Sequence, residues 1–375
     1  MYSLTLPGIT RKILSDKTKP IFMLCRFTDT LLDPSIINTI LISRRLGIKA
    51  SKTGIRELFF AKCRLKPAIS IRDICEVLFE IGITVTPARV SWQHLGKISA
   101  PFMILFEQKA ESHFCLVVDR VGDELQVLDP YTNVVRAYPL GYFYGKDSIV
   151  LAIAKFNSGF MEEGYADRVA AEEAADAAYR ESVRVIPGVF SPAECDAIVA
   201  YYEHNKALLE KSVVDRISAD GKTFVEPSYS RTCEISLFSH FGQSEELLDR
   251  IAGVLGSSAE KFETPSILRY DVGQEFKIHH DAFNGDERRH TVLVYLNEDF
   301  EGGETFLPEI DLKVVPKKGS CLVFTNIDEQ LQIIPQSLHS SLPIIAGVKY
   351  ALITIECRNA FVGRREDDLV AFNRV

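Results

Sequence analysis

Residues 270–281 read Tyr-Asp-Val-Gly-Gln-Glu-Phe-Lys-Ile-His-His-Asp, and this stretch decides how the C-terminal half of the chain is interpreted. Its pattern is that of a β-strand that ends in a polar segment. His279 and Asp281 are two residues apart, and side chains at that spacing point to the same face of a strand. His280 points to the opposite face, so we give it no part in the site.

An imidazole and a carboxylate on one face need a third ligand to hold a divalent metal, and His339 is the candidate. Two histidines and one carboxylate form the facial triad that binds non-haem Fe(II) and leaves coordination positions open. An isolated His-x-Asp has a plain alternative, a strand-end histidine beside a surface aspartate. The metal hypothesis therefore depends on the surrounding pattern.

That pattern is long, and it begins and ends with residues that flank the three candidates. In chain order it comprises Tyr270, Gly273, Phe276, His279 and Asp281, Tyr295-Leu296-Asn297, Gly302-Gly303-Glu304-Thr305-Phe306, Asn326-Ile327-Asp328, Ser337-Leu338-His339, Pro343 and Gly347-Val348-Lys349-Tyr350. Together these residues resemble the catalytic domain of prolyl 4-hydroxylase-like Fe(II)/2-oxoglutarate dioxygenases over about residues 184–358. The resemblance implies that His279, Asp281 and His339 are both the metal ligands and the catalytic centre.

The resemblance also implies a cosubstrate site for 2-oxoglutarate. Lys349 would pair with its distal carboxylate, because a compact ammonium on a long stem suits a buried carboxylate. Thr291 and Tyr270 match positions that hydrogen-bond the cosubstrate, with core packing as the alternative for Tyr270. O2 would be the second cosubstrate, and ascorbate is a candidate reductant. The reaction would convert 2-oxoglutarate to succinate while a C–H bond is hydroxylated.

The fold expected for this half is mainly β, a double-stranded β-helix (jelly roll) with flanking helices. Ser191-Pro192-Ala193-Glu194 carries the signals of a helix start, and a further amphipathic helix fits residues 243–255. The short strands that the pattern predicts are 265–272, 275–281, 290–297, 312–316, 320–325, 333–338 and 349–357.

Composition sets the broad class of the protein. With 375 residues, 46% of them hydrophobic and 25% charged, the chain has room for two ordinary globular domains. A net charge of −8 argues against a general nucleic-acid binder. The eight cysteines form no Cys-x-x-Cys pair and read as reduced thiols. We find neither an apolar run that could span a membrane nor a signal peptide, and expect a cytoplasmic protein.

The N-terminal half, residues 1–155, has an α+β pattern. Helices are predicted over residues 33–47 and 69–81, and apolar runs at 102–106, 113–118 and 125–128 predict an antiparallel sheet. His113 begins one predicted strand and Asp129 ends the next, as the base and its orienting carboxylate do in a thiol protease. The spacing alone favours the simpler interpretation, a strand-end histidine and a turn aspartate without catalytic role.

Residues 22–155 resemble the papain-like peptidase domain of bacteriocin-processing ABC transporters, which cleave leader peptides after a double glycine. The family places its nucleophile in an Asp-Cys-Gly at the first helix, where this chain has Asp33-Pro34-Ser35. Proline has no thiol, and Thr28 stands where the family has an oxyanion-hole glutamine. Cys25 lies nine residues before the nucleophile position. We therefore predict a degenerate domain that is not an active cysteine peptidase.

Three segments and one function follow. Residues 1–155 would bind a peptide leader, 156–183 would form an acidic, Ala-rich helical linker, and 184–375 would be the dioxygenase. The predicted function is hydroxylation of a peptidyl residue, proline first, in a ribosomally made peptide with a double-glycine-type leader. The alternatives are a hydroxylase of a folded protein or free amino acid with a purely structural N-terminal domain, and a non-catalytic peptide-binding protein.

Overall fold

The structure is a computed structural model of the 375-residue chain. It describes residues 33–63, 69–107, 112–130, 134–145, 147–217, 223–227, 231–282, 285 and 287–361. The chain divides into two compact units, residues 1–174 and 175–375. No helix in the described ranges combines the length and the apolar character needed to cross a membrane. Cys25 and Thr28 lie outside the described residues.

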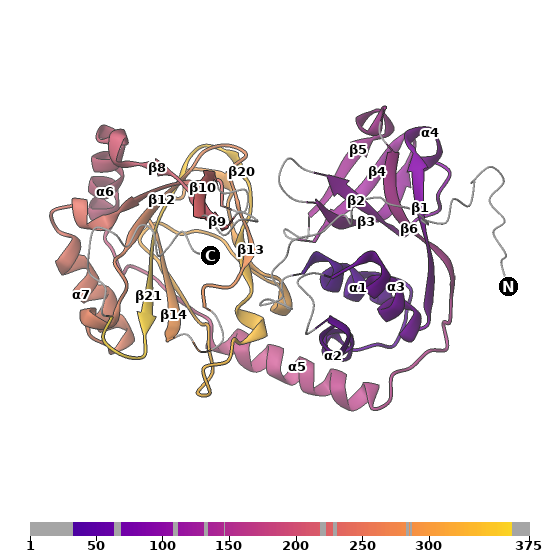
Figure 1. Cartoon of the computed structure of the whole chain (residues 1–375). Helices are drawn as coiled ribbons and strands as arrows, with labels where there is room; N and C mark the ends of the chain where they lie inside the picture. Colours follow the sequence, from indigo (N-terminus) through magenta and orange to yellow (C-terminus); the bar gives the residue numbers. More distant parts are fainter. Residues whose placement is uncertain are drawn as a thin grey trace. The chain divides into compact units, whose positions relative to one another are not determined.

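Unit 1 is an α+β domain, as predicted. Helices described before its sheet are α1 (Pro34–Arg45), α2 (Lys52–Cys63) and α3 (Ile71–Glu80). They gather on one face of an antiparallel sheet with the order β1-β6-β2-β3-β4-β5 (Figure 1). The strands are β1 (Ile83–Ser91), β2 (Phe102–Glu107), β3 (Ser112–Val121), β4 (Glu124–Asp129), β5 (Val134–Pro139) and β6 (Asp147–Phe156). A short helix, α4 (Trp92–Leu95), follows β1.

Alternation along β2 shows how the sheet separates two apolar layers. Met103 and Leu105 pack with the helices, whereas Phe102, Ile104 and Phe106 belong to the cluster on the other face. Successive side chains of a strand point to opposite faces, so the continuous apolar run predicted as a strand buries both of its sides. His113 at the start of β3 and Asp129 at the end of β4 lie at the same end of the sheet.

Side chains cap the starts of helices in both units, as predicted for Ser191 and Glu194. Asp33 accepts a hydrogen bond from the backbone N–H of Ser35 at 2.7 Å, and Ser70 and Asp73 form a capping box at α3. Ser191 and Glu194 form a second capping box at α6 (Pro192–His204). Pro34 occupies the first turn of α1, where a proline is tolerated because its missing N–H would have no helical partner.

Helix α2 was not predicted, and much of the support for its N-terminus comes from far along the chain. The backbone N–H of Thr53 donates to Glu172 at 2.6 Å, and that of Ser51 donates to Glu162 at 2.7 Å. Both glutamates come from the acidic segment more than 100 residues further along the chain. Negative side chains stabilise the positive end of a helix. Ser51 adds a local cap, because its hydroxyl accepts from the N–H of Gly54 at 2.9 Å. The two glutamates left no local signal in the sequence, but Ser51 was a signal that the sequence analysis missed.

Unit 2 is mainly β with flanking helices, as predicted. One sheet has the order β7-β18-β14-β21-β12-β11-β8 and the other has the order β13-β19-β16-β17. From β12 onward the chain passes back and forth between these two sheets, which is the arrangement of a jelly roll. The two sheets consist of β7 (Arg184–Ile186), β8 (Glu210–Lys211), β11 (Glu234–Leu237), β12 (Ser266–Tyr270), β13 (Phe276–His279), β14 (Arg288–Tyr295), β16 (Thr305–Leu307), β17 (Leu312–Val314), β18 (Cys321–Thr325), β19 (His339–Ser341) and β21 (Lys349–Cys357).

Two smaller pairs complete the strands of unit 2, β9 (Val213–Ile217) with β10 (Thr223–Pro227), and β15 (Glu301–Gly302) with β20 (Ile344–Ala346). Helices α6 and α7 (Ser244–Leu255) pack on the outer face of the larger sheet. In β14, Val292 and Val294 join this outer cluster, and Leu293 and Tyr295 join the cluster between the sheets. The interior of the roll is thus lined by every second residue.

The strand predicted at 333–338 was wrong. A 3-10 helix, η6 (Pro335–Ser337), occupies this segment, and the strand begins only at His339. Proline fixes φ near the helical value and lacks the N–H that a ladder needs, so Pro335 suits the first turn of a helix better than a strand. The strand predicted at 275–281 ends at His279, which places Asp281 just beyond it.

The acidic Ala-rich segment contains helix α5 (Tyr165–Ser182), within the predicted helical range. It is not solvated along its whole length. Tyr179 is buried in the interior cluster of unit 2, and its hydroxyl donates to the carbonyl of Thr325 at 2.6 Å. Residue 174, the last of unit 1, lies inside this helix.

Candidate metal centre and active site

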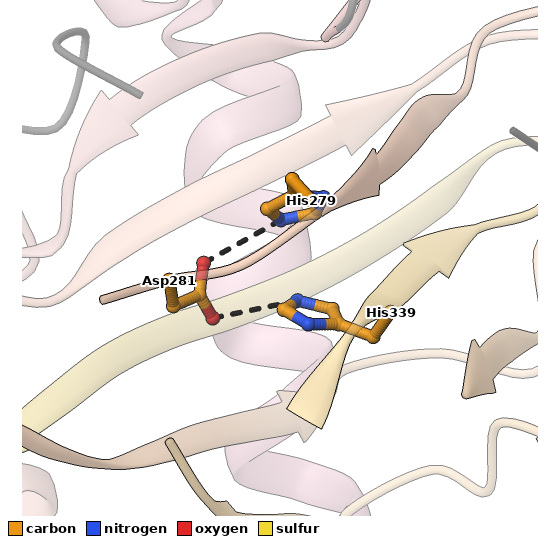
Figure 2. Close-up of side chains that lie close together, drawn as sticks. All are labelled: His279, Asp281 and His339. Atoms are coloured by element: carbon orange, nitrogen blue, oxygen red, sulfur yellow. Dashed lines mark ion pairs between the residues drawn. The ribbon is translucent and has the colours of Figure 1, made fainter. Parts of the chain in front are cut away.

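Strand pairing brings the predicted metal ligands together. His279 ends β13 and His339 begins β19, and the two residues are direct partners in this antiparallel pair. Asp281 lies between the two imidazoles, with His279 Nε2 3.4 Å from Oδ1 and His339 Nε2 3.4 Å from Oδ2 (Figure 2). All three side chains are buried. One ligand atom from each lies within 4.8 Å of the others, which is close enough for one metal ion.

Backbone carbonyls fix the tautomer of both imidazoles. His279 Nδ1 donates to the carbonyl of Lys277 at 2.7 Å, and His339 Nδ1 donates to that of Ser337 at 2.9 Å. Each Nε2 is thereby left with a lone pair directed at the centre. Nε2 of His279 is buried and has no hydrogen-bond partner among the described residues. Such an atom is costly unless something occupies the centre, and a divalent metal fits the donor set.

The protonation states also suit a metal. Burial alone would raise the pKa of Asp281, but His339, His279 and the hydroxyl of Thr291 together hold it far below its usual range. Burial and the neighbouring His279 lower the pKa of His339 to about 4, against the opposing effects of Asp281 and the Ser337 carbonyl. At neutral pH the site therefore presents a carboxylate and neutral imidazole, the forms that bind metal.

Two residues at the start of β14 hold Asp281 in place. Thr291 Oγ1 donates to Asp281 Oδ2 at 2.6 Å, and Asn326 Nδ2 donates to Thr291 Oγ1 at 2.9 Å. Arg288 donates to the backbone carbonyl of Asp281 at 3.0 Å while it forms a two-pronged ion pair with Glu263, at 2.6 and 3.1 Å. Thr291, predicted to bind the cosubstrate, thus contacts a metal ligand, and its cosubstrate role stays a prediction.

Glu263 was not found from the sequence, because it lies 25 residues from the arginine that it pairs with. Asn326 was part of the motif but had no assigned role, and the structure places its amide on the Thr291 hydroxyl. Phe276 was part of the quoted motif without an assigned role, and the structure supplies a contact. Its ring stacks on the imidazole of His279, with centroids 3.5 Å apart and planes 18° apart. The ring covers one face of the imidazole and, together with the Lys277 carbonyl, limits its rotation.

The ammonium of Lys349 is buried in the interior of unit 2. Its side chain is buried, and Nζ donates to the carbonyl of Gly303 at 2.7 Å and to Ser341 Oγ at 2.9 Å. The rings of Tyr270 and Tyr295 have their centroids 5.1 and 5.8 Å from Nζ. No carboxylate of the described residues forms an ion pair with Lys349, and a buried ammonium without a counter-charge is costly. The carboxylate of a bound dicarboxylate would supply that charge.

Burial lowers the pKa of Lys349 to about 7, against the opposing effects of Cys233 and Glu304. Tyr270, the other predicted cosubstrate residue, is buried beside the ammonium. Burial and the neighbouring Cys233 thiol raise the pKa of Tyr270 well above its ordinary value, so its hydroxyl stays protonated and can donate. The ring of Tyr270 belongs to the interior cluster and also lies beside the Lys349 ammonium. Its position is therefore compatible with both core packing and a cosubstrate role.

Gly303 explains why the motif has glycine beside this pocket. Its φ is +67°, and a Cβ built on it would lie 2.5 Å from Ile344 Cδ1 and 3.2 Å from Lys349 Cδ. A side chain here would push on the stem of Lys349, and the left-handed backbone conformation already favours glycine. The glycine thus makes room for the lysine whose ammonium its carbonyl accepts.

Comparison with known proteins agrees with this geometry. Residues 265–355 match the family described as the 2OG-Fe(II) oxygenase superfamily. The C-terminal unit contains a 2OG-Fe(II) oxygenase domain. This finding supports the predicted dioxygenase and its use of Fe(II), 2-oxoglutarate and O2. The matched residues include the whole triad and Lys349, and none of unit 1.

Curated relatives of the chain include prolyl 4-hydroxylases. The chain is 29% identical to prolyl 4-hydroxylase 5 of Arabidopsis thaliana over 178 residues, which are 40% of this chain and 61% of that protein. It is 32% identical to prolyl 4-hydroxylase 13 of the same plant over 148 residues, 31% of this chain and 52% of that protein. The chain therefore spans between about half and two thirds of the length of these relatives.

Among solved structures, one similar chain is the viral collagen prolyl hydroxylase from Paramecium Bursaria Chlorella virus-1 in its 2OG complex. It is 27% identical, with a TM-score of 0.36, over 46% of this chain and 94% of that chain. The resemblance of residues 22–155 to leader peptidases stays a prediction.

Replacing Thr291 by valine is expected to weaken metal binding about 10- to 100-fold, the usual cost of losing an outer-shell partner. Valine keeps the shape of threonine but removes the hydroxyl that orients Asp281. Isothermal titration of the metal-free protein with Mn²⁺ measures the effect. Thr291→Ser, which keeps the hydroxyl, is the matched control and should bind as wild type does. Equal affinity in both variants and wild type would contradict this role.

The pKa of Lys349 predicts a pH dependence of stability in the ligand-free protein. Between about pH 7 and the ordinary lysine value of 10.5, the folded chain has lost this proton while the unfolded chain keeps it. The unfolded state then binds more protons, so this group makes the free energy of unfolding rise with pH across that window. Urea unfolding at several pH values should show a steeper rise for wild type than for Lys349→Met. Parallel curves for the two proteins would refute it.

Proposed function

We propose that the C-terminal unit is an Fe(II)- and 2-oxoglutarate-dependent hydroxylase of a peptidyl residue, with proline the first candidate. The observation that carries the proposal is the pairing of two incomplete sites in one roll. His279 offers a buried lone pair with no hydrogen-bond partner in the described chain, and Lys349 offers a buried ammonium with no carboxylate partner there. A metal and a dicarboxylate complete the two sites together.

His279, Asp281 and His339 would hold the iron, and Lys349 with Ser341 would bind the distal carboxylate of 2-oxoglutarate. When bound, Fe(II) supplies the oxygen-activating chemistry, in which O2 and 2-oxoglutarate give succinate and CO2 while a substrate C–H becomes C–OH. The chain's own contribution is orientation. Carbonyls fix the imidazoles, Thr291 and Arg288 fix the carboxylate, and the aromatic walls exclude water from the ammonium.

The choice of a peptidyl proline rests on the relatives, whose names state prolyl 4-hydroxylation. The first alternative is a hydroxylase that acts on a free amino acid or a folded protein. The second alternative is a non-catalytic peptide-binding protein. The complete, buried triad argues against a domain without catalytic activity. Such a domain would have no need to keep a buried metal-binding nitrogen that lacks a hydrogen-bond partner.

Unit 1 is proposed to capture the leader of a ribosomally made peptide, with the catalytic unit acting on its core. Its first described helix begins at Pro34, where a cysteine peptidase would carry a thiol. Phe60 on α2 and Phe79 on α3 are 53% and 66% exposed, and apolar anchors of this kind bind amphipathic helices. The cysteines that the structure describes are all free thiols, which fits the proposed cytoplasmic setting.

Succinate formation tests the hydroxylase directly. Wild type loaded with Fe(II) and given 2-oxoglutarate and O2 should release succinate even without substrate, at a low uncoupled rate. His279→Ala should abolish this release, since it removes a ligand. His240→Ala, a change at an exposed histidine of unit 2, is the matched control and should retain the wild-type rate. Iron-independent release, or equal release by His279→Ala, would reject the proposal.

Leader capture is tested with a fluorescein-labelled amphipathic peptide that ends in Gly-Gly. Its anisotropy should rise on addition of the full chain, and Phe79→Ser should weaken binding about tenfold through the loss of one buried apolar contact. A scrambled peptide of equal composition is the control. If the full chain binds the scrambled peptide as tightly as the amphipathic peptide, leader capture is contradicted and unit 1 is a structural module.

A further inference from the structure

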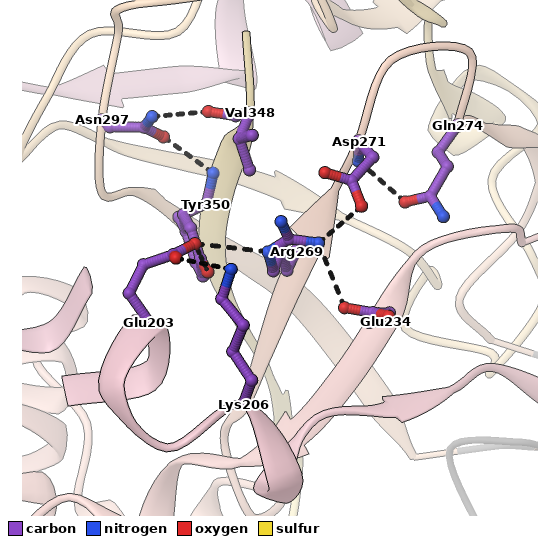
Figure 3. Close-up of polar contacts among 9 residues, drawn as sticks. All are labelled: Glu203, Lys206, Glu234, Arg269, Asp271, Gln274, Asn297, Val348 and Tyr350. Carbon is purple, nitrogen blue, oxygen red and sulfur yellow. Dashed lines mark hydrogen bonds and ion pairs between the residues drawn. The ribbon is translucent and has the colours of Figure 1, made fainter. Parts of the chain in front are cut away.

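The backbone on both sides of Lys349 is held by one side chain. Asn297 Oδ1 accepts a hydrogen bond from the N–H of Tyr350 at 2.7 Å, and Asn297 Nδ2 donates to the carbonyl of Val348 at 2.7 Å. Figure 3 shows the amide facing both groups. Asn297 therefore brackets Lys349 as a neighbouring strand would, with one donor and one acceptor on the flanking peptide groups. Its Nδ2 also donates to Asp299 Oδ1 at 2.8 Å, which holds the amide in this orientation.

This bracket lies where the regular ladder stops. Strand β14 ends at Tyr295, whose partner in β21 is Ala351, and the N–H of Leu296 still donates to the carbonyl of Tyr350 at 3.0 Å. Beyond that bond no strand residue of β14 is left to pair with the segment at Lys349. The amide of Asn297 takes the place of the next peptide group in the ladder.

The segment before Lys349 needs such support. Gly347 has φ +81°, and a Cβ on it would lie 2.9 Å from the carbonyl oxygen of Asp299. The glycine makes a tight turn possible, but it also leaves the backbone with more freedom than any other residue would. Without the bracket, the first residue of β21 would follow a flexible turn, and its long side chain would amplify any shift of the backbone.

A second set of contacts ties down the opposite face of the same strand. Tyr350 points away from the roll, and its hydroxyl donates to Glu203 Oε1 at 2.6 Å. Arg269 joins this carboxylate to Asp271 and Glu234, with distances of 3.4, 2.6 and 3.1 Å to the three acids (Figure 3). Arg269 is the strand partner of Tyr350, and the next pair along these two strands is Tyr270 and Lys349, both of which are buried. The charged cluster therefore supports the strands on the side opposite to the Lys349 ammonium.

We propose that Asn297 is a positioning residue that sets the affinity of the site for the distal carboxylate of 2-oxoglutarate. It acts by fixing the peptide groups on both sides of Lys349. The position of Nζ relative to the bound carboxylate is thereby fixed as well. Asn297 contacts neither the cosubstrate nor the metal. This inference rests on the proposed function, because it presumes that Lys349 binds the cosubstrate.

Asn297→Ala tests the proposal through binding rather than turnover. Titration of the Mn²⁺-loaded full chain with 2-oxoglutarate should give a dissociation constant about tenfold above wild type, since a small misplacement of a positioned group is expensive. The dissociation constant for Mn²⁺ itself should stay within about twofold of wild type, because the triad lies in another pair of strands.

Pyruvate provides the readout that a merely structural role would not move. It is a 2-oxo acid without the distal carboxylate, so its affinity for the Mn²⁺-loaded chain should be the same in wild type and Asn297→Ala. The matched control is Asn205→Ala, which removes a similar bond from an amide to the Tyr201 carbonyl at 2.8 Å at the end of α6. It should lower the thermal midpoint and leave both affinities unchanged.

The outcomes separate the two proposals. If wild type binds Mn²⁺ but not 2-oxoglutarate, the proposed function fails and this inference fails with it. If wild type binds 2-oxoglutarate and Asn297→Ala binds it equally well, or loses pyruvate to the same extent, only the positioning role fails. Should Asn297→Ala not fold, Asn297→Gln keeps the amide but displaces it by one methylene from the Val348 and Tyr350 peptide groups. A rise of about threefold in the dissociation constant is then expected for 2-oxoglutarate alone.

Discussion

Burial of charge is the constraint on which unit 2 depends. The Asp281 carboxylate and the Lys349 ammonium both lie inside the roll. Burying an ion without a compensating partner costs roughly several kcal/mol of folding free energy. Neither is paired with the other. Asp281 is surrounded by two imidazoles, a hydroxyl and the loop held by Arg288, whereas Lys349 has a carbonyl, a hydroxyl and two ring faces. The two opposite charges thus lie in separate parts of the same interior, which we call the metal compartment, around Asp281, and the ammonium compartment, around Lys349.

The division explains why the motif residues are spread along the chain. The metal compartment belongs to the small sheet, through β13 and β19, and the ammonium compartment belongs to the large sheet, through β12 and β21. A jelly roll passes alternately from one sheet to the other, so residues for each compartment recur at intervals along the sequence. Gly303 and Ser341 come from connecting segments and the small sheet, and they complete the ammonium compartment from the opposite side.

The site was largely predictable because its chemistry needs rare residue types at fixed spacings. His279 and Asp281 were found because they are two residues apart on a predicted strand, and His339 and Lys349 because of the motif around them. The supports could not be found in the same way. Glu263 reaches Arg288 across 25 residues, and Glu172 caps α2 across 119. Partnerships of this kind depend on the tertiary fold, and a glutamate in the sequence is compatible with many surroundings. The error at 333–338 was local, since an apolar run concealed the effect of Pro335.

Helix α5 has a practical consequence for anyone who separates the two halves. A fragment that starts at residue 184, where the catalytic pattern begins, leaves out Tyr179, which fills the interior cluster of unit 2 and bonds to the end of β18. A fragment that stops at residue 155 leaves out both glutamates that cap α2. Each piece would then expose apolar surface or unsatisfied amides that the intact chain covers. Overlapping fragments that both retain residues 162–182 avoid this damage, so the helix has to be duplicated rather than divided.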